Sequence, residues 1–462
     1  MIYNIKLRDS FNRSDYINSN MSKLVAKNTI FALASGSGKA GIAVIRISGP
    51  SAGAAYQILS KKPTPKPRRV TNVRLFSPNS NEVLDDGLVI YYIAPASFTG
   101  EDVIELHIHG GLSVIASISE ALNSIDDVRL AEAGEFTRRA FDNGKLDLTA
   151  AEGLADLINA ETGSQRRQAQ RQLRGELASI YNGWRARLIN SIALFEAEID
   201  FSDEDLPPGL QDKVTSEVFQ INTEITRHLD DKNQGEILRN GFYITIVGPP
   251  NAGKSSLLNR LSKRDVAIVS EKAGTTRDVI EVRIELDGYP VILADTAGLR
   301  ESEDDLESEG VRRAEERAKN ADLKLVVFDG AVWPEKDDKT QELVDENTLI
   351  LVNKSDLIKQ TEIKTLAVSS LNGHGFDDLL GTLKKEVFER CGVSASPALT
   401  RTRHRAALID CRTCLERFRE KSEAELKAED LRLAARALGK ITGQVNVEEV
   451  LDIIFGEFCI GK

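Results

Sequence analysis

The sequence predicts a multidomain chain of mixed α/β and all-α type. A mainly parallel, doubly wound sheet is inserted into a helical domain, and a small α+β domain precedes both. Three observations predict this architecture. Short β-rich runs mix with one or two helical patterns near the N-terminus, apolar residues recur at helical spacing in two separate blocks, and strands alternate with helices between those blocks. Strands that alternate with helices favour a parallel sheet, because each helix carries the chain back to the same edge.

The composition is that of a globular protein and narrows the classes of function. The chain has 462 residues, a formal net charge of −11 and 28% charged residues. A protein held on nucleic acid mainly by bulk charge would be basic, so only local contact with nucleic acid is expected. Four cysteines are too few for a disulfide scaffold and fit a reducing compartment. No apolar run reaches the roughly 18 residues of a membrane span, so we expect a cytoplasmic protein without a membrane partner.

The N-terminal third predicts a tail followed by a small domain. Residues 1–24 lack a signal-peptide core and are expected to be a disordered extension or a misplaced start, since Met21 opens the first convincing strand pattern. Residues 25–143 are expected to form the α+β domain. The elements expected within it are strands at 42–47, 83–93 and 102–109 and a helix near 112–123.

The rest of the chain predicts a helical domain interrupted by an α/β domain. Residues 144–240 show helical periodicity, and Leu173, Leu177 and Ile180 are expected to share a helix face. Residues 241–392 form the inserted domain, and residues 393–462 complete the helical domain with a Phe-Cys-Ile-Gly-Lys tail. The strands expected in the inserted domain lie at 243–247, 291–294, 323–328 and 348–352.

A phosphate-binding motif opens the inserted domain. Gly248-Pro-Pro-Asn-Ala-Gly-Lys-Ser255 fits the pattern G-x-x-x-x-G-K-[ST], follows a strand pattern and opens a helical one. Its backbone N–H groups are expected to cradle phosphate oxygens at the helix N-terminus. Lys254 would reach the β- and γ-phosphates as a catalytic group, and Ser255 would ligate Mg²⁺.

Further segments predict that the nucleotide is GTP. Asp295-Thr-Ala-Gly298 ends a strand and would lie beside the magnesium and the γ-phosphate. Asn353-Lys-Ser-Asp356 also ends a strand, and its final carboxylate can accept hydrogen bonds from N1–H and the 2-amino group of guanine, which adenine lacks. Thr276, within a mobile switch at 274–278, is expected to be catalytic and to ligate Mg²⁺ with Ser255. The residues expected to bind GTP are Asn251, Ala252, Gly253, Lys254, Ser255, Ser256, Ser270, Glu271, Lys272, Ala273, Gly274, Thr275, Thr276, Asp295, Thr296, Ala297, Gly298, Asn353, Lys354, Ser355, Asp356, Ser369, Ser370 and Leu371.

Together these motifs resemble the MnmE (TrmE) family of tRNA-modification GTPases. The resemblance covers residues 25–462. It rests on Asn251 in the phosphate loop, the segments 274–278 and 295–300, and the C-terminal Phe458-Cys-Ile-Gly-Lys462. The N-terminal motifs Gly41–Gly49, Phe98–Asp102 with Glu105, and Gly134–Phe136 through Lys145–Asp147 match it too.

The resemblance implies an N-terminal folate-binding domain and a GTPase that works with partners. The family forms homodimers and joins a flavin (FAD) protein, MnmG, in a heterotetramer. Together they add an aminomethyl or carboxymethylaminomethyl group to carbon 5 of the wobble uridine of certain tRNAs. A reduced folate, methylene- or formyl-tetrahydrofolate, supplies the carbon, and GTP is hydrolysed with Mg²⁺ and K⁺.

The resemblance also implies residue roles. Many GTPases orient water with a Gln after the Asp-x-x-Gly turn, but Leu299 stands there, so another group must assist hydrolysis. The family's acidic residue matches Glu307, which we favour over a solvated acidic loop. The K⁺ ligands implied are Asn251, Ser270, Lys272 and Thr275, and the folate-binding residues implied are Arg46, Glu105, Lys145 and Lys462.

Some signals keep alternative readings. Cys459 is either a nucleophile toward the uridine ring or part of a tail that completes the folate pocket. Cys411 and Cys414 lack two further zinc ligands at suitable spacing, so helix packing is favoured. The arginines of 401–405 are interpreted either as tRNA contacts or as a solvated basic face. The alternative for the whole chain is a ribosome-assembly or regulatory GTPase, but no convincing KH-like loop is present.

Overall fold

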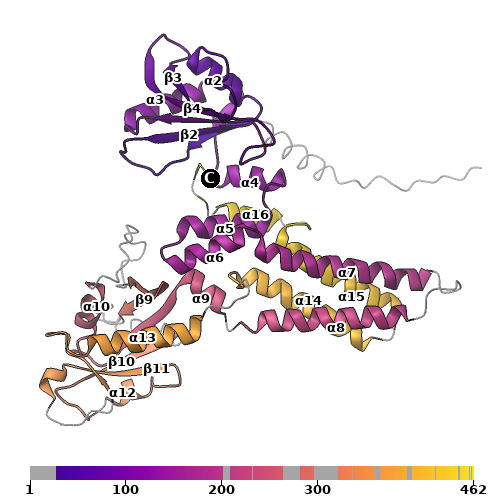
Figure 1. Ribbon diagram of the computed structural model, residues 1–462. Helices are drawn as coiled ribbons and strands as arrows, with labels where there is room; N and C mark the ends of the chain where they lie inside the picture. Colours follow the sequence, from indigo (N-terminus) through magenta and orange to yellow (C-terminus); the bar gives the residue numbers. More distant parts are fainter. Residues whose placement is uncertain are drawn as a thin grey trace, which may run out of the picture. The chain divides into compact units, whose positions relative to one another are not determined.

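The computed structural model describes most of the chain. The described residues are 28–200, 209–231, 233–263, 281–295, 321–335, 337–358, 365–392, 398–421, 423–445, 448–456, 458, 460 and 461. The chain divides into two compact units (Figure 1), one of Met1–Ala155 with Val445–Lys462 and the other of Asp156–Gln444. The boundaries of the five segments expected from the sequence remain predictions, but the structure groups the last residues with the N-terminal unit.

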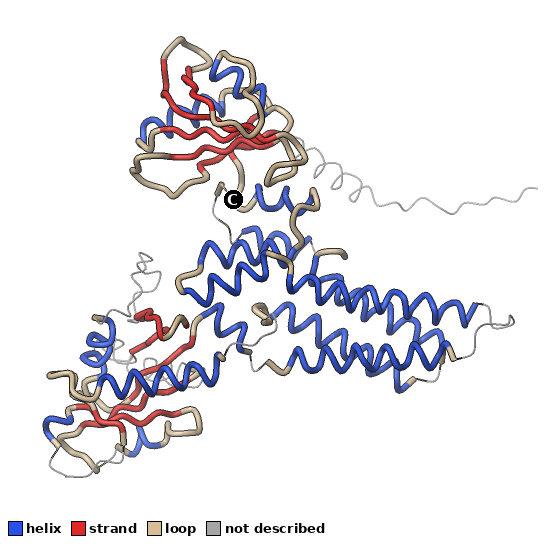
Figure 2. The backbone as a smooth tube through the Cα atoms, viewed as in Figure 1, coloured by secondary structure: helices blue, strands red, loops and turns tan. Residues whose placement is uncertain are grey.

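The first unit is built on a six-stranded sheet in the order β3-β4-β5-β2-β1-β6. β1 and β6 are parallel, and the other neighbours are antiparallel. Strands and helices of this unit are drawn in red and blue in Figure 2. The elements are β1 (Thr29–Leu33), β2 (Ala43–Ser48), α2 (Ala52–Ser60), β3 (Thr71–Phe76), β4 (Val83–Tyr92), β5 (Val103–Ile108), α3 (Leu112–Asn123), β6 (Val128–Leu130), α4 (Glu135–Asp142), α5 (Leu148–Asn159, which crosses the boundary) and α16 (Glu448–Gly456).

The two faces of this sheet have different roles. Because successive side chains of a strand point to opposite faces, Ile104, Leu106 and Ile108 lie on one face and Glu105 and His107 on the other. The first face joins α2 and α3 in a core that includes Phe31, Ile45, Tyr56, Leu106 and Leu122. The second face is therefore free of that core and carries polar side chains.

The second unit combines a helical bundle with an α/β domain. A large apolar core joins α7, α8, α14 and α15, with Tyr181, Trp184, Leu408 and Leu438 buried in it. The helices of the bundle and its connections are α6 (Gly163–Leu173), α7 (Glu176–Asp200), α8 (Leu210–Leu229), α9 (Gln234–Asn240), α14 (Thr402–Glu420) and α15 (Ala424–Thr442). Residues far apart in sequence thus complete one bundle, as the two helical blocks predicted.

The α/β domain contains a second six-stranded sheet in the order β12-β11-β10-β7-β9-β8. All its described pairs are parallel except β8 with β9. Leu257 of α10 and Phe376 of α13 pack against the sheet in one core. The elements are β7 (Phe242–Val247), α10 (Lys254–Ser262), β8 (Glu281–Leu286), β9 (Tyr289–Asp295), β10 (Leu323–Asp329), α12 (Asp338–Gln341), β11 (Thr348–Asn353), the 3₁₀ turn η2 (Ser355–Leu357), β12 (Leu366–Ala367) and α13 (Phe376–Cys391).

These elements confirm the fold class and correct some details. The four strands expected in the inserted domain match β7, β9, β10 and β11, and the helix near 112–123 matches α3. The prediction that Leu173, Leu177 and Ile180 share one helix face was wrong. Leu173 ends α6, the other two residues lie on α7, and the chain turns between these helices. Gly175 adopts a φ of 82°, which favours glycine and ends a helix. None of the helices in the described ranges is long and apolar enough to cross a membrane.

Candidate functional site

The phosphate loop is shaped by two glycines at which a side chain has no room. Gly248 follows β7, and a Cβ there would lie 2.2 Å from the carbonyl oxygen of Val327. Gly253 has a φ of 87° and precedes α10. A Cβ on Gly253 would lie 2.3 Å from Nδ2 of Asn353. The loop therefore comes close to the strands beside it, and the N–H groups at the start of α10 are available to an anion.

Lys254, Ser255 and Asp295 form the phosphate side of the site. The Lys254 ammonium is mostly buried and donates to the carbonyl oxygens of Gly248 and Pro249, each at 2.8 Å. Ser255 Oγ donates to Asp295 Oδ2 at 2.6 Å, and Asp295 ends β9 with 1% exposure. A hydroxyl and a carboxylate are hard oxygen ligands of the kind that Mg²⁺ prefers. Two of the residues predicted beside the magnesium, Ser255 and Asp295, are therefore brought together here.

Asn353 joins the phosphate loop to the base-recognition loop. Its amide nitrogen donates to the carbonyl oxygen of Ala252 at 2.9 Å, and its Oδ1 accepts from the Ser370 amide at 3.1 Å and hydroxyl at 3.0 Å. The side chain is 1% exposed, so these bonds are protected from water. Asn353 consequently fixes the spacing between the two loops.

Asp356 lies in the neighbouring turn, where its carboxylate is oriented by Ser369. Ser369 Oγ donates to Asp356 Oδ1. The Lys354 ammonium donates to Asp329 Oδ2 at 2.7 Å, which anchors the same segment to the end of β10. Ser355 is held by a bond from its backbone amide to the carbonyl oxygen of Val368. A carboxylate held in this way is suited to accept paired hydrogen bonds from a guanine edge.

The sequence reasoning missed Arg260 and Asp329. Arg260 of α10 donates to the carbonyl oxygens of Ser370 and Leu371 at 3.0 and 3.1 Å, and its guanidinium lies over the Phe376 ring. Leu371 is 84% exposed beside it. Asp329 was detectable as an acidic residue at the end of a strand parallel to the one that ends at Asn353. Nothing in the sequence indicated Arg260.

Substitution of Gly253 by alanine tests the loop geometry. The new methyl group would strain the backbone and clash with Asn353, so we expect a stability loss of about 1–3 kcal/mol and weaker GTP binding. The matched control is Gly381→Ala in α13, where a Cβ meets no atom within 4 Å. Thermal unfolding and GTP titration of both variants are the measurements. Equal behaviour of the two variants would contradict the close approach of the loop to Asn353.

Several predicted residues lie outside the described ranges. They are Ser270, Glu271, Lys272, Ala273, Gly274, Thr275, Thr276, Thr296, Ala297, Gly298, Glu307, Cys459 and Lys462. Of the predicted K⁺ ligands, only Asn251 is described, with a left-handed φ of 63° in the phosphate loop. The roles of these residues stay predictions.

Arg46 and Glu105 meet on the second face of the N-terminal sheet. They are register partners on β2 and β5. Arg46 Nε and Nη2 donate to Glu105 Oε1 at 3.0 and 2.8 Å. The guanidinium also lies 5.5 Å from the ring centroid of Phe98 and 5.8 Å from that of Phe136. The pair is thus charged, held in place and bordered by aromatic rings.

Other residues around this pair have varied positions. His107 Nε2 lies 3.9 Å from Glu105 Oε2. Burial and the Glu105 charge raise the pKa of the Tyr92 hydroxyl. The Lys145 ammonium donates to the carbonyl oxygen of Pro95 at 2.9 Å, and among the described residues it makes no hydrogen bond or ion pair with Arg46 or Glu105. The structure therefore brings together two of the four residues predicted for folate and places Lys145 on a neighbouring loop.

The C-terminal tail belongs to the same unit as this face. Ile460 forms an antiparallel bridge with Ala133. A Cβ on Gly461 would lie 2.1 Å from the carbonyl oxygen of Leu33, so the tail passes close to the end of β1. Phe455 of α16 packs with Phe141 and Leu148 in a small apolar core. The tail is therefore held against the N-terminal sheet.

The cysteines and arginines with alternative readings have structural partners. Cys411 and Cys414 are buried on α14, and burial raises the pKa of both thiols. The helix-packing interpretation is confirmed by their place in the bundle core. Arg401 pairs with Asp156, and Arg405 with Asp231 and Glu236. These ion pairs give Arg401 and Arg405 a structural role that needs no contact with RNA.

Comparisons with known proteins cover nearly the whole chain. Residues 29–145 match the model of the GTP-binding protein TrmE N-terminus, and residues 148–459 match the MnmE helical domain. Proteins named tRNA modification GTPase MnmE are 54% identical in Paramagnetospirillum magneticum and 50% identical in Rhodospirillum rubrum. Each alignment covers 94% of this chain and 99% of the relative.

A further relative and a solved structure complete the comparison. The Rickettsia typhi protein of the same name is 47% identical, over 94% of this chain and all of the relative. A variant of Aquifex aeolicus Era bound to GDP·AlF4⁻ is 27% identical over 39% of this chain and 68% of that chain. Its TM-score of 0.26 is too low to add to the assignment. The full-length relatives and both domain matches agree with the motifs, and the chain belongs to the MnmE (TrmE) family of tRNA modification GTPases.

Proposed function

We propose that this chain is a cytoplasmic, K⁺-dependent GTPase that modifies carbon 5 of the wobble uridine in certain tRNAs. It acts as a homodimer with an MnmG-type FAD protein. The group installed is aminomethyl or carboxymethylaminomethyl, and its one-carbon unit comes from a reduced folate. The observation that carries the proposal is the presence in one chain of a GTP-type site and of the partly buried Arg46–Glu105 pair.

The nucleotide part of the proposal rests on side chains that meet at one edge of the mainly parallel sheet. Lys254 would release its loop carbonyls to hold β- and γ-phosphate oxygens. Ser255 and Asp295 fit Mg²⁺, which would neutralise charge on those oxygens when bound. Asp356 would select guanine. Each of these residues binds or orients, so catalysis depends on electrostatic positioning.

The K⁺ part of the proposal rests on the need for groups that do the work of the missing glutamine. Leu299 cannot hydrogen-bond to the attacking water, so the site needs another source of positive charge and another group to orient water. Asn251 supplies a side-chain oxygen in the phosphate loop, suited to a monovalent cation. Ser270, Lys272 and Thr275 would complete the K⁺ site, and Glu307 would position water. A second G domain would order these segments in the dimer.

The folate part of the proposal rests on the chemistry of the Arg46–Glu105 pair. A pterin ring presents adjacent N–H donors, which suit the carboxylate of Glu105. The side chains are 22% and 15% exposed, so hydrogen bonds made there are only partly screened by water. Phe98 and Phe136 border the guanidinium and would flank a planar ring. Lys145 and Lys462 would contribute positive charge.

Replacement of Arg46 by alanine tests whether the N-terminal site is needed for tRNA modification but not for GTP hydrolysis. The change leaves Glu105 without its partner, so folate binding and tRNA modification should be lost. GTP hydrolysis by the purified variant should stay within about twofold of wild type, since Arg46 lies in the other unit. The measurement is mass spectrometry of tRNA nucleosides from a deletion strain that carries each variant.

The matched control is Arg69→Ala, an exposed arginine of the same domain. It should restore modification as wild type does. If Arg46→Ala restores modification, the Arg46–Glu105 pair is not the folate site. If wild type fails to restore wobble-uridine modification, the proposed function is wrong, and the ribosome-assembly GTPase becomes the better explanation.

A further inference from the structure

Arg260 of α10 is bound to main-chain carbonyl groups of one loop. Its Nη1 donates to the carbonyl oxygens of Ser370 and Leu371 at 3.0 and 3.1 Å. The guanidinium carbon lies 5.5 Å from the centroid of the Phe376 ring, so the cation and the ring attract each other. A charged donor makes stronger hydrogen bonds than a neutral one. The two carbonyl groups are consequently held in fixed directions.

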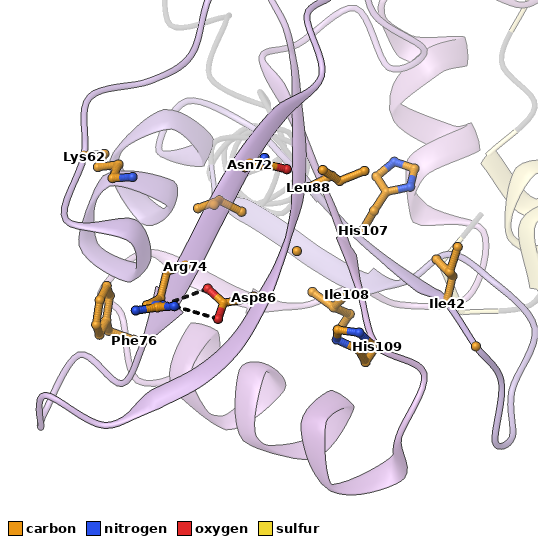
Figure 3. A pocket seen from close by; sticks show the side chains of 13 residues that line it. Ile42, Lys62, Asn72, Arg74, Phe76, Asp86, Leu88, His107, Ile108 and His109 are labelled. Atoms are coloured by element: carbon orange, nitrogen blue, oxygen red, sulfur yellow. Dashed lines mark hydrogen bonds and ion pairs between the residues drawn. The ribbon is translucent and has the colours of Figure 1, made fainter.

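Other arginines of the chain are bound differently. Arg74 lines a cavity of about 740 Å³ beside His107 and pairs through Nε and Nη2 with Asp86, at 2.7 and 2.9 Å (Figure 3). That arginine pairs with a carboxylate and neutralises its charge. The two bonds of Arg260 go instead to consecutive peptide groups, and their effect is to set the shape of a loop.

The loop that Arg260 contacts, residues 369–375, closes tightly beside the guanidinium. Gly373 has a φ of 89°, which favours glycine, and a Cβ there would lie 2.2 Å from Arg260 Nη2. The Gly373 amide donates to the carbonyl oxygen of Ser369 at 2.8 Å. A side chain at position 373 would therefore push the guanidinium from the place that it occupies.

The peptide groups held by Arg260 direct their N–H groups away from it. In a trans peptide the C=O and N–H bonds point in opposite directions, and neither of the cis peptide bonds among the described residues lies in this loop. The Leu371 N–H, opposite the Ser370 carbonyl, makes no hydrogen bond with the described residues and is available to a ligand. The Asn372 N–H, opposite the Leu371 carbonyl, donates to Ser369 Oγ at 3.4 Å.

This loop lies next to the carboxylate expected to bind guanine, because Ser369 Oγ donates to Asp356. A base that pairs with Asp356 through its position 1 presents the substituent at position 6 beside that contact. Guanine has an oxygen acceptor at position 6, and adenine has an amino donor there. A backbone N–H held in a fixed direction would bond to the oxygen and would repel the amino group.

We propose that Arg260 is a positioning residue for guanine recognition, which holds the 369–375 loop so that the Leu371 N–H faces the 6-oxo group of GTP. The inference rests on the guanine site of the proposed function, in which Asp356 accepts hydrogen bonds from the base. Asp356 reads positions 1 and 2, and the loop held by Arg260 reads position 6. Arg260 acts only through the loop.

The test compares three nucleoside triphosphates by equilibrium titration of the full chain with Mg²⁺. Inosine triphosphate lacks the 2-amino group of GTP but keeps the 6-oxo group. 2,6-Diaminopurine riboside triphosphate has an amino group at position 6 and no N1–H. Wild type should bind GTP at least about tenfold more tightly than either analogue.

Arg260→Ala should weaken GTP and inosine triphosphate about fivefold each, the effect of one hydrogen bond, and should leave the diaminopurine nucleotide within about twofold. The preference for GTP over the diaminopurine nucleotide therefore falls about fivefold, while the preference over inosine triphosphate stays the same. Arg260→Lys keeps a donor but loses the planar fork, so its preference should lie between those of wild type and Arg260→Ala. It also tests the inference if Arg260→Ala does not fold.

The matched control is Lys263→Ala, an exposed lysine at the end of the same helix, which should keep both preferences. The inference is overturned if the Arg260 variants keep the wild-type preference over the diaminopurine nucleotide. It is also overturned if all three nucleotides weaken in parallel, because Arg260 would then have only a structural role. If wild type itself does not prefer GTP to the analogues, the guanine selection in the proposed function fails as well.

Discussion

Lys254→Ala is expected to lower the rate of GTP hydrolysis at least about a hundredfold. The Lys254 ammonium is mostly buried and held by the carbonyl oxygens of Gly248 and Pro249, at the mouth of the phosphate loop. Alanine removes the fixed positive charge that would face the β- and γ-phosphates, where charge develops in the transition state. The measurement is phosphate release by the purified chain at saturating GTP, Mg²⁺ and K⁺.

The control for this prediction is Lys263→Ala, an exposed lysine that caps the same helix at its other end. It should hydrolyse GTP at the wild-type rate. In a deletion strain, Lys263→Ala should restore tRNA modification and Lys254→Ala should not. Modification restored by Lys254→Ala would mean that the protein is required but its GTP hydrolysis is not, and the coupling proposed above would be wrong.

Asp356→Asn is expected to weaken GTP binding by about a thousandfold or more. The carboxylate of Asp356 would accept two hydrogen bonds from the guanine edge, and asparagine replaces one acceptor with a donor that faces another donor. A binding site whose hydrogen-bonding groups no longer match those of the ligand discriminates strongly. Xanthosine triphosphate has an oxygen in place of the 2-amino group, so the variant should bind that nucleotide more tightly than GTP.

The measurement is titration of fluorescent GTP and xanthosine triphosphate analogues into both proteins. Asp378→Asn, an exposed aspartate at the start of α13, is the control and should keep the preference for GTP. Because Ser369 donates to Asp356, an intact thermal unfolding curve must accompany the change in preference. An Asp356→Asn variant that still prefers GTP would show that another group reads the base.

Much of the nucleotide site could be predicted, because its motifs are local. The phosphate loop follows β7, and Asp295 and Asn353 are the last residues of β9 and β11 in the mainly parallel sheet. Parallel strands end at one edge, so residues just beyond those ends meet in any chain with this pattern. Arg260 could not be predicted, since it lies on an ordinary helix face and reaches the carbonyl oxygens of Ser370 and Leu371 only after α10 packs.

The N-terminal site was less accessible to sequence reasoning. Arg46 and Glu105 were assigned from family resemblance, because by itself Arg46 has the pattern of a surface residue on a strand. Only the register of β2 with β5 places the two side chains opposite each other. A one-residue shift would turn either side chain to the other face of the sheet. Lys145 illustrates the same limit, since its contact with Pro95 follows from a loop conformation.

The sequence by itself determined the fold class, the GTP-type nucleotide site and the family. Those properties depend on periodicity and on short motifs whose residues are neighbours along the chain. The tertiary structure decided the Arg46–Glu105 contact, the cavity beside His107, the Asn353 link between two loops, and the break between α6 and α7 at Gly175. These depend on strand register and on packing between distant segments, which arise from the free energy of the whole chain and leave no local pattern.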